Sequence, residues 1–293
     1  MTTMTAAPPD AEPTATRSPA RRAASRRWKP SRVVLFVLLV GIAVVMLYPF
    51  LFMTDASLRS QSQFDQGSGH SWSSWGDLVH TLPVGQQLLN STIVCVAAIA
   101  LILAAAAPAG FAFAKLRYRG STAVFLGVVG AMLVPLQSII VPLYVNMAHV
   151  GLINNYLGAV LVYAAFGTPF ATFLMTTYYR GLPDELVEAA VVDGHGYFGI
   201  FRRIALPMAV PALVTVTVLQ FIQIWDDLLI GLLFLQNPDN RTITVGLATL
   251  SSGRVTSIPI LMAGSLLSAV PAIVVYLVFQ RHLVKGLTLG IGK

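Results

Sequence analysis

The sequence is poor in charge and holds a single cysteine, and both shortages exclude classes of protein. Only 11% of its 293 residues are charged, about half the share of a typical soluble domain, whereas 56% are hydrophobic. This composition excludes a large soluble lobe and indicates a multi-pass membrane protein. Because Cys95 is alone and lies in an apolar run, we expect no disulfide within the chain and no Cys-x-x-Cys metal site.

Sequence motifs for catalysis are missing as well. The histidines are scattered, without a His-Glu-x-x-His pair, and no Gly-x-Ser-x-Gly motif is present. The tail 286–293 superficially suggests a phosphate-binding loop. However, Leu287 stands where that loop needs a glycine, and no serine or threonine follows Lys293. We therefore expect no catalytic residue, no metal site and no ATP hydrolysis by this chain.

Six apolar segments have the length, about 20 residues, that crosses the hydrocarbon core of a bilayer. They cover residues 33–54, 87–110, 121–147, 157–178, 208–234 and 259–281. The preceding residues 1–31 are rich in Ala, Pro, Thr and Arg, which predicts a disordered basic arm. The sequence thus predicts this arm and a transmembrane domain over residues 32–293.

The positions of Lys and Arg predict how the six spans are oriented. If the N-terminus is cytoplasmic, the inner segments hold 16 of the 19 Lys and Arg residues, with Arg281 counted at the inner boundary of the sixth span, and no other falls inside a span. Cytoplasmic segments of membrane proteins show this bias. We therefore predict an all-α integral membrane fold in the cell membrane with six transmembrane helices and both termini in the cytoplasm. The loop 180–207 would then be cytoplasmic, and the loop 236–258 would lie outside.

The longest polar stretch between apolar runs, residues 183–211, predicts two short helices. Pro183 fits a first helical position, and the acidic residues that follow suit a helix N-terminus. Gly194 is expected to end this helix in a left-handed cap. The second helix, with an apolar stripe through Phe201, is expected to end at Leu206-Pro207. An ordinary polar loop between two helices is the alternative.

Polar side chains gather in the fifth predicted span, where ionisable groups are costly and usually face a cavity or a partner. Carboxylates, amides and an indole together suit a ligand rich in hydroxyl groups. A structural cluster near the outer end of the helix is the alternative. The candidate residues of a substrate path are Gln220, Gln223, Trp225, Asp226 and Asp227.

Several motifs resemble one known family. Glu188-Ala189-Ala190-x-x-Asp193-Gly194, followed by Phe201-x-x-Ile204-x-Leu206-Pro207-x-x-x-Pro211, resembles the EAA loop of bacterial ABC-importer permeases. Carbohydrate-type permeases are similar at Asn90-Ser91, Trp225-x-Asp227, Thr242-x-Thr244-Val245-Gly246-Leu247 and the tail from Gln280. The resemblance covers most of the chain from the first span on. It is to the second of two permease subunits, the maltose-permease type, and implies a type I ABC-importer permease fold.

The resemblance also implies partners. In that family the inner loop is a coupling helix that docks in a cleft on a separate ATPase subunit, which binds ATP and magnesium. A second permease, two ATPase subunits and an extracytoplasmic sugar-binding protein are implied, and nucleic acid is not. His195 stands where the family often has a small residue, which leaves its local contact open. The implied coupling residues are Glu188, Ala189, Ala190, Asp193, Gly194, Phe201, Leu206 and Pro207, and the implied ATPase-contacting tail residues are Gly286, Gly290 and Lys293.

The function that follows is a permease subunit of an ATP-driven importer for a sugar, with a di- or oligosaccharide expected. One alternative is the same machinery with a non-sugar solute, such as a glycerol phosphodiester or a peptide. Apart from Arg281 at the inner end of the sixth span, the spans offer no cationic residue for an anionic substrate, which disfavours a highly charged one. A second alternative is an ion-coupled secondary transporter that works without an ATPase and uses Asp226 and Asp227 as its ion site.

Overall fold

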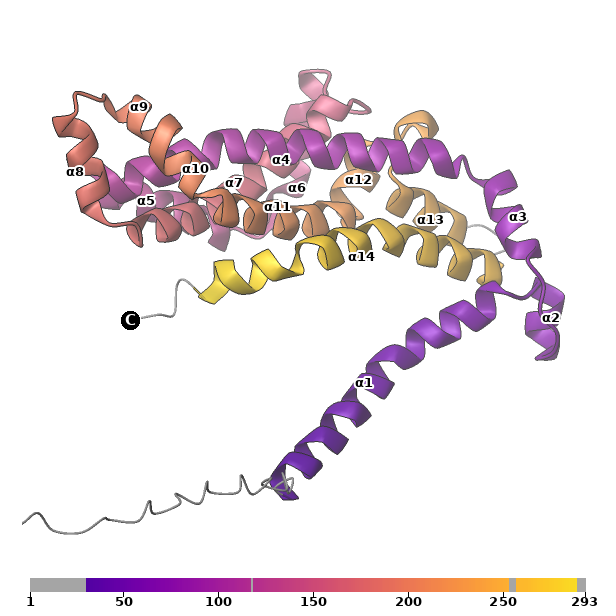
Figure 1. Cartoon of the computed structure of the whole chain (residues 1–293). Coiled ribbons are helices and arrows are strands. Elements are labelled where there is room, and N and C mark those ends of the chain that lie inside the picture. The colour runs from indigo at the N-terminus through magenta and orange to yellow at the C-terminus, as the bar shows by residue number, and fades with distance from the viewer. Residues whose placement is uncertain (1–29, 117, 253–256, 289–293) are drawn as a thin grey trace, which may run out of the picture. The chain divides into compact units, whose positions relative to one another are not determined.

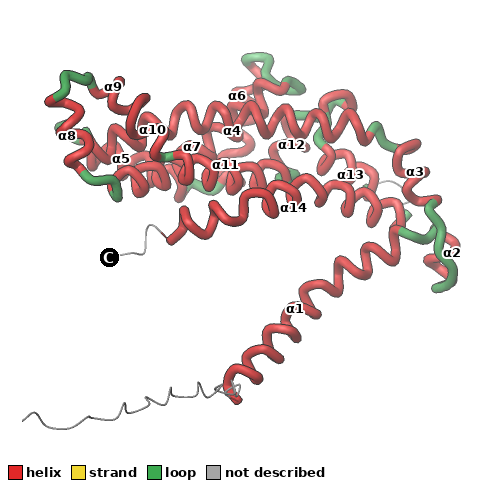
Figure 2. The backbone as a smooth tube through the Cα atoms, viewed as in Figure 1, coloured by secondary structure: helices red, strands yellow, loops and turns green. Residues whose placement is uncertain are grey.

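The computed structural model describes residues 30–116, 118–252 and 257–288. Within these ranges the chain is helical and contains no strand (Figure 2). The all-α prediction is therefore confirmed for the described residues. The predicted basic arm lies outside them up to residue 29, and α1 (Pro30–Ser57) begins with the next residue.

The chain divides into two compact units, residues 1–49 and 50–293, which are described separately. The first unit contains most of α1, whose side chains from Val34 to Val40 are exposed. The helical stretch Val34–Ser57 is long and apolar enough to cross a membrane. An apolar helix with exposed side chains is suited to contact with lipid.

Two long helices, α4 (Val84–Lys115) and α7 (Tyr156–Arg180), form the frame of the second unit. They make the most extensive helix pairing in this unit, and each is long and apolar enough to span a membrane. Small residues allow helices in a membrane to approach closely. A Cβ atom on Gly110 of α4 would lie 2.6 Å from Met175 Cβ of α7, which leaves room for glycine alone.

The helices α11 (Val210–Trp225) and α14 (Ile258–Thr288) complete the core of this unit. α11 packs against α4, α7 and α14, and α14 also runs along α3 (Ser73–Thr81) (Figure 1). These contacts place α11 inside the bundle. Thr215 and Gln220 of α11 are accordingly buried, whereas Gln223 near the end of the helix is exposed.

The predicted span 121–147 is bent. It consists of α5 (Ser121–Gly130), a 3₁₀ turn at Ala131–Leu133 and α6 (Leu136–His149), and the two parts meet at 95°. Pro135 forms the corner, because proline disfavours a helical conformation in the residue before it. Val134 is accordingly extended, with ψ of 110°.

The predicted span 208–234 is divided twice. Its first part bends by 71° at Ala209, between the segment Tyr197–Met208 and α11. A second break follows Trp225, before α12 (Leu229–Phe234). The described residues thus contain four helices long and apolar enough to cross a membrane, or up to six if each bent pair is one span.

Short helices occupy the two ends of the second unit. Figure 1 shows α8 and α9 at one end of α4, and α3 and α13 at the other. The long helix α4 therefore connects the two ends. The remaining short elements are α2 (Gln61–Gln66), α8 (Asp184–Val192), α9 (Tyr197–Ile200), a π-helical turn at Phe201–Ala205, α10 (Leu206–Met208), a 3₁₀ turn at Pro238–Asn240 and α13 (Ile243–Ser251).

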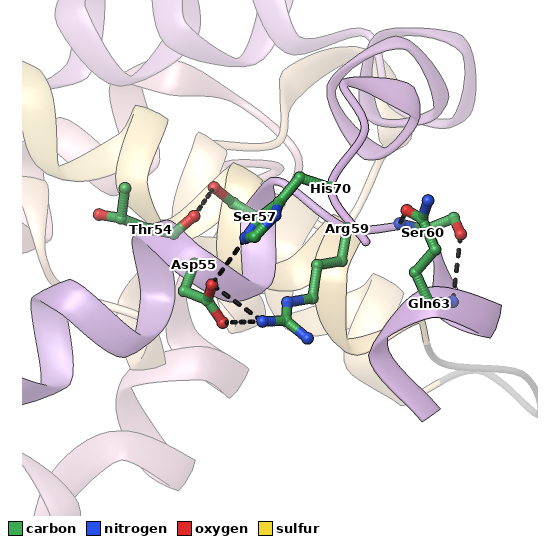
Figure 3. A network of polar contacts seen from close by, with 7 residues as sticks. All are labelled: Thr54, Asp55, Ser57, Arg59, Ser60, Gln63 and His70. Atoms are coloured by element: carbon green, nitrogen blue, oxygen red, sulfur yellow. Dashed lines mark hydrogen bonds and ion pairs between the residues drawn. The ribbon is translucent and has the colours of Figure 1, made fainter. Parts of the chain in front are cut away.

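A polar network fixes the segment that follows α1 (Figure 3). The Arg59 guanidinium donates to the Asp55 carboxylate, and His70 Nε2 lies 3.0 Å from Asp55 Oδ1. Ser60 and Gln63 then exchange side chain and backbone hydrogen bonds in a capping box that begins α2. The chain is thereby held in place where it turns from α1 toward α3.

Candidate functional site

The inner loop forms the first short helix that the sequence predicts. Pro183 is the N-cap of α8 and not its first residue, so that prediction is wrong by one position. Asp184 and Glu185 occupy the first turn, where the helix dipole favours negative charge. Gly194 follows the helix with a φ of 82°, which confirms the predicted left-handed cap. In this geometry the N–H of His195 donates to the Ala190 carbonyl oxygen over 3.0 Å.

One face of α8 and of the turn after it is exposed and partly apolar. Val192 and Phe198 are 86% and 75% exposed. The predicted coupling residues Glu188, Ala189, Asp193 and Gly194 are exposed as well. Exposed apolar side chains beside polar ones are typical of a contact surface for another protein. We call this surface, residues 188–198 without Ala190, the inner docking surface, after the cytoplasmic docking role that the resemblance to ABC-importer permeases implies.

Three of the predicted coupling residues face the protein itself. Ala190 is buried, so only Ala189 of that pair lies on the inner docking surface. The Phe201 ring lies 5.6 Å from that of Phe111 on α4, and Leu206 packs against the core. These residues fasten the loop to the membrane helices.

The second short helix differs from the prediction. It passes through a π-helical turn and exposed Pro207, and it ends at Met208, so the expected end at Leu206-Pro207 is wrong. Pro207 sits near the start of α10, where its missing N–H is tolerated. The Tyr178 hydroxyl donates to the Met208 carbonyl oxygen over 2.6 Å, which ties this end to α7.

Lys115, the last residue of α4, lies beside the start of α8. Its ammonium group donates to the carbonyl oxygen of Leu182 and to the carboxylate of Asp184. A cavity of about 460 Å³, lined by Lys115, Asp184 and Glu188 among others, separates the end of α4 from α8. No local pattern in the sequence predicts this role of Lys115, because its partners lie 67 and 69 positions away.

The candidate substrate-path residues do not form one cluster. Gln220, Gln223 and Asp227 line a pocket of about 110 Å³, together with side chains of α7. Trp225 is buried elsewhere, and its indole N–H donates to the Ser268 carbonyl oxygen of α14 over 2.9 Å. Asp226 is exposed just beyond the end of α11 and does not line this pocket.

The Asp227 carboxylate is held by the fold. Its Oδ1 accepts the Tyr163 hydroxyl and the N–H of Ile230, each over 2.9 Å. A side-chain oxygen that accepts a backbone N–H in the first turn stabilises a helix start. Asp227, two residues before α12, therefore helps to hold the first turn of that helix and braces it against α7.

Gln220 is the most enclosed polar group of the pocket. Its side chain is buried, and its Nε2 has no hydrogen-bond partner among the described residues. Gly167 of α7 leaves space for the Gln220 side-chain oxygen, because a Cβ at Gly167 would lie 2.6 Å from Gln220 Oε1. Phe166 and Gln223 line both this pocket and a larger, mainly apolar cavity of about 600 Å³, whose other walls come from the turn at Ala131–Leu133, α6 and α7. Such a combination is typical of small-molecule sites.

Two asparagines fix the beginning of the predicted outer loop. Asn90 Nδ2 on α4 donates to the carbonyl oxygens of Asp239 and Arg241 over 2.8 and 2.9 Å. Asn154 Oδ1 accepts the N–H groups of Gln236 and Asn237 over 2.7 and 2.9 Å. Asn154 has a φ of 57°, a conformation that asparagine tolerates better than most residues. Asn154 is not among the candidate residues predicted from the sequence.

The predicted ATPase-contacting tail is described only in part. Gly286 falls within α14, which extends to Thr288, whereas Gly290 and Lys293 lie outside the described residues.

Comparisons with known proteins agree with this architecture. The model of the family "Binding-protein-dependent transport system inner membrane component" matches residues 106–289. The osmoprotective compounds uptake permease protein GgtD of Synechocystis sp. is 33% identical over 217 residues, 74% of this chain and 73% of that protein. The arabinooligosaccharides transport system permease protein AraQ of Halalkalibacterium halodurans is 34% identical over 201 residues, 69% of this chain and 71% of that protein.

A solved structure shares the fold. It is the crystal structure of a bacterial ABC transporter involved in the import of the acidic polysaccharide alginate, with a TM-score of 0.75 and 24% identity. The likeness covers 87% of this chain and 98% of that chain. The family match spans the end of α4, the inner docking surface and α11. The chain therefore belongs to the family of inner membrane components of binding-protein-dependent transport systems, the permease subunits of ABC importers.

Proposed function

We propose that this chain and a second permease subunit together form the translocation path of an ATP-driven importer for a sugar. Membership of the permease family supports the transport role. Two similar proteins carry names that refer to an oligosaccharide and a polysaccharide, which supports a di- or oligosaccharide as the transported solute.

The inner docking surface is the part that would receive an ATPase subunit. Two such subunits, which bind ATP and magnesium, would supply the energy, and this chain would carry out no chemical step. The observation that carries this proposal is the exposure of Glu188 and Val192 on α8 and of Phe198 on α9, the two short helices that the Gly194 turn joins. The tail from Gly286 to Lys293 would add a second contact with the ATPase.

The pocket at Gln220 would form part of the substrate path. An amide N–H that stays unpaired inside a protein costs about 1–3 kcal/mol, so a passing hydroxyl group that accepts from it would be favoured. Gln223 and Phe166 could add a further polar contact and an apolar face for a sugar ring. Trp225 and Asp227 would stabilise the surrounding helices and would not bind the sugar, because the Trp225 indole N–H and the Asp227 carboxylate already have hydrogen-bond partners.

The outer loop would face the substrate-binding protein. The hydrogen bonds of Asn90 and Asn154 support this, because they fix residues 236–241 and thus give a partner a preformed surface. A rigid surface loses less conformational entropy when it binds.

Co-purification tests this proposal. The chain is extracted from its native membrane through a tag, and the proteins that accompany it are identified. We expect a second permease and an ATPase, and we expect the variant Gly194→Val to lose the ATPase, because valine strongly disfavours a positive φ. Gly199→Ala is the matched control, since Gly199 lies in the same loop with open space around its Cβ position.

The rival functions give different results in the same experiment. A chain that purifies alone, and whose uptake persists without an ATPase, would support the ion-coupled secondary transporter. If the partners are present, a panel of sugars, glycerol phosphodiesters and peptides is tested for stimulation of ATP hydrolysis. Stimulation by a non-sugar solute alone would overturn the sugar assignment.

A further inference from the structure

The ammonium group of Lys115 is enclosed where α4 ends. Its side chain is only 3% exposed, although Asp184, one of its two partners, is 66% exposed. A buried ammonium group is unfavourable unless its N–H groups are bonded, and here they meet a carbonyl oxygen and a carboxylate. The enclosed position and the two bonds hold the lysine against the segment that leads into α8.

The two acceptors lie at one end of α8. Asp184 is the first residue of that helix, and Leu182 precedes it by two positions. Most of the rest of α8 is exposed, and Ala190 is its one buried residue. The bonds of Lys115 therefore fix the beginning of α8 relative to α4, and the exposed remainder stays available to a partner.

The helix α4 is also bonded, at the end opposite to Lys115, to the predicted outer loop. Residues 90 and 115 are about 37 Å apart along α4, at 1.5 Å of rise per residue. Asn90 is fully buried, bonds to the backbone of Asp239 and Arg241, and accepts the Tyr156 hydroxyl over 2.8 Å. One continuous helix thus connects the inner docking surface with the outer loop (Figure 1).

Taking α8 as the helix that docks on the ATPase, which rests on the function proposed above, we propose that Lys115 is a positioning residue that fastens α8 to α4. A displacement of α8 by the ATPase then moves α4 as well, and Asn90 passes the movement to the outer loop. Without the bonds of Lys115, the beginning of α8 loses its polar link to α4, and the loop depends on apolar contacts such as that of Phe201 with Phe111. The beginning of α8 can then shift under the docked ATPase with less movement of α4. ATP hydrolysis would then proceed with less transport.

The test measures uptake per ATP hydrolysed in the complete transporter, reconstituted in vesicles with its ATPase subunits and binding protein. Lys115→Met should assemble and hydrolyse ATP, but its uptake per ATP should fall by about tenfold, which corresponds to about 1.4 kcal/mol of coupling energy. Lys115→Arg should retain most of the wild-type ratio, because its guanidinium can also donate to both acceptors. Arg119→Met is the control, since Arg119 is an exposed cation four residues further on.

A second pair of variants avoids the risk that Lys115→Met fails to fold. Asp184 and Glu185 are adjacent, exposed carboxylates in the first turn of α8, and a salt bridge joins the first of them to Lys115. Asp184→Ala should lower uptake per ATP several-fold, and Glu185→Ala should leave it near the wild-type value. Equal behaviour of the two variants would overturn the proposal.

Two further results would also overturn it. One is a Lys115→Met transporter that couples as well as the wild type. The other is a parallel loss of assembly, ATP hydrolysis and uptake in Lys115→Met that Lys115→Arg does not reverse. Failure of the proposed function is recognised separately, because the wild-type protein itself would then show no ATP-dependent uptake.

Discussion

The close contact of α4 and α7 at Gly110 gives a quantitative prediction for Gly110→Ala. The new Cβ would lie 2.6 Å from Met175 Cβ and 2.9 Å from the backbone nitrogen of Thr176. Carbon atoms prefer separations of about 3.5–4.0 Å, so the two helices must move apart by about 1 Å. Overpacking of this kind costs about 1–3 kcal/mol.

The matched control is Gly85→Ala in the same helix. No atom lies within 4 Å of a Cβ at Gly85, so alanine there should be neutral or should stabilise the helix by up to about 1 kcal/mol. The two variants thus introduce the same methyl group into one helix, and only Gly110→Ala is expected to lower the stability of the fold.

The assay is thermal unfolding of the purified protein in mild detergent, at one fixed heating rate because membrane protein unfolding is commonly irreversible. At that heating rate Gly110→Ala should lower the midpoint clearly below that of the wild type, because the overpacked helices lose stability in the folded state. A midpoint at or above that of the wild type, with Gly85→Ala unchanged, would refute the account of how α4 and α7 pack.

Four other predictions concern single sites. Asn154→Ala removes the acceptor for two backbone N–H groups, so hydrogen exchange at residues 236–237 should become faster. Trp225→Phe removes the bond to Ser268 and should lower the free energy of unfolding by about 1 kcal/mol, measured as a lower midpoint. Gln220→Leu removes an unpaired buried amide, so the midpoint should rise or stay unchanged while sugar uptake falls. Cys95 is buried and should react with a maleimide only after denaturation.

Local chemistry explains what could be predicted from the sequence. Runs of apolar residues set the positions of the long helices, because a helix satisfies its own backbone groups in lipid. The cap at Gly194 was predictable for a similar reason, since a glycine directly after a helix favours a left-handed conformation there. Both features depend on residues that are neighbours in the chain.

Features that depend on contacts between distant segments could not be predicted from the sequence. The partners of Lys115 lie 67 and 69 positions away, and those of Asn154 lie 82 and 83 positions away. The candidate path residues were expected to share one helix, but α11 ends at Trp225, so Asp226 and Asp227 leave its register. Where a helix ends in this region depends on packing against α7 and α14, which no local pattern reveals.

Uptake in reconstituted vesicles tests the central claim most directly. The chain is assembled with its co-purified permease and ATPase subunits, and uptake of a radiolabelled sugar into the vesicles is measured. The binding protein is supplied or withheld on the side of the outer loop, and ATP is supplied or withheld on the side of the ATPase subunits. The account predicts uptake only when both are present, and its loss in the Gly194→Val variant. Sugar uptake that continues without ATP and the ATPase subunits, driven by an ion gradient, would contradict it.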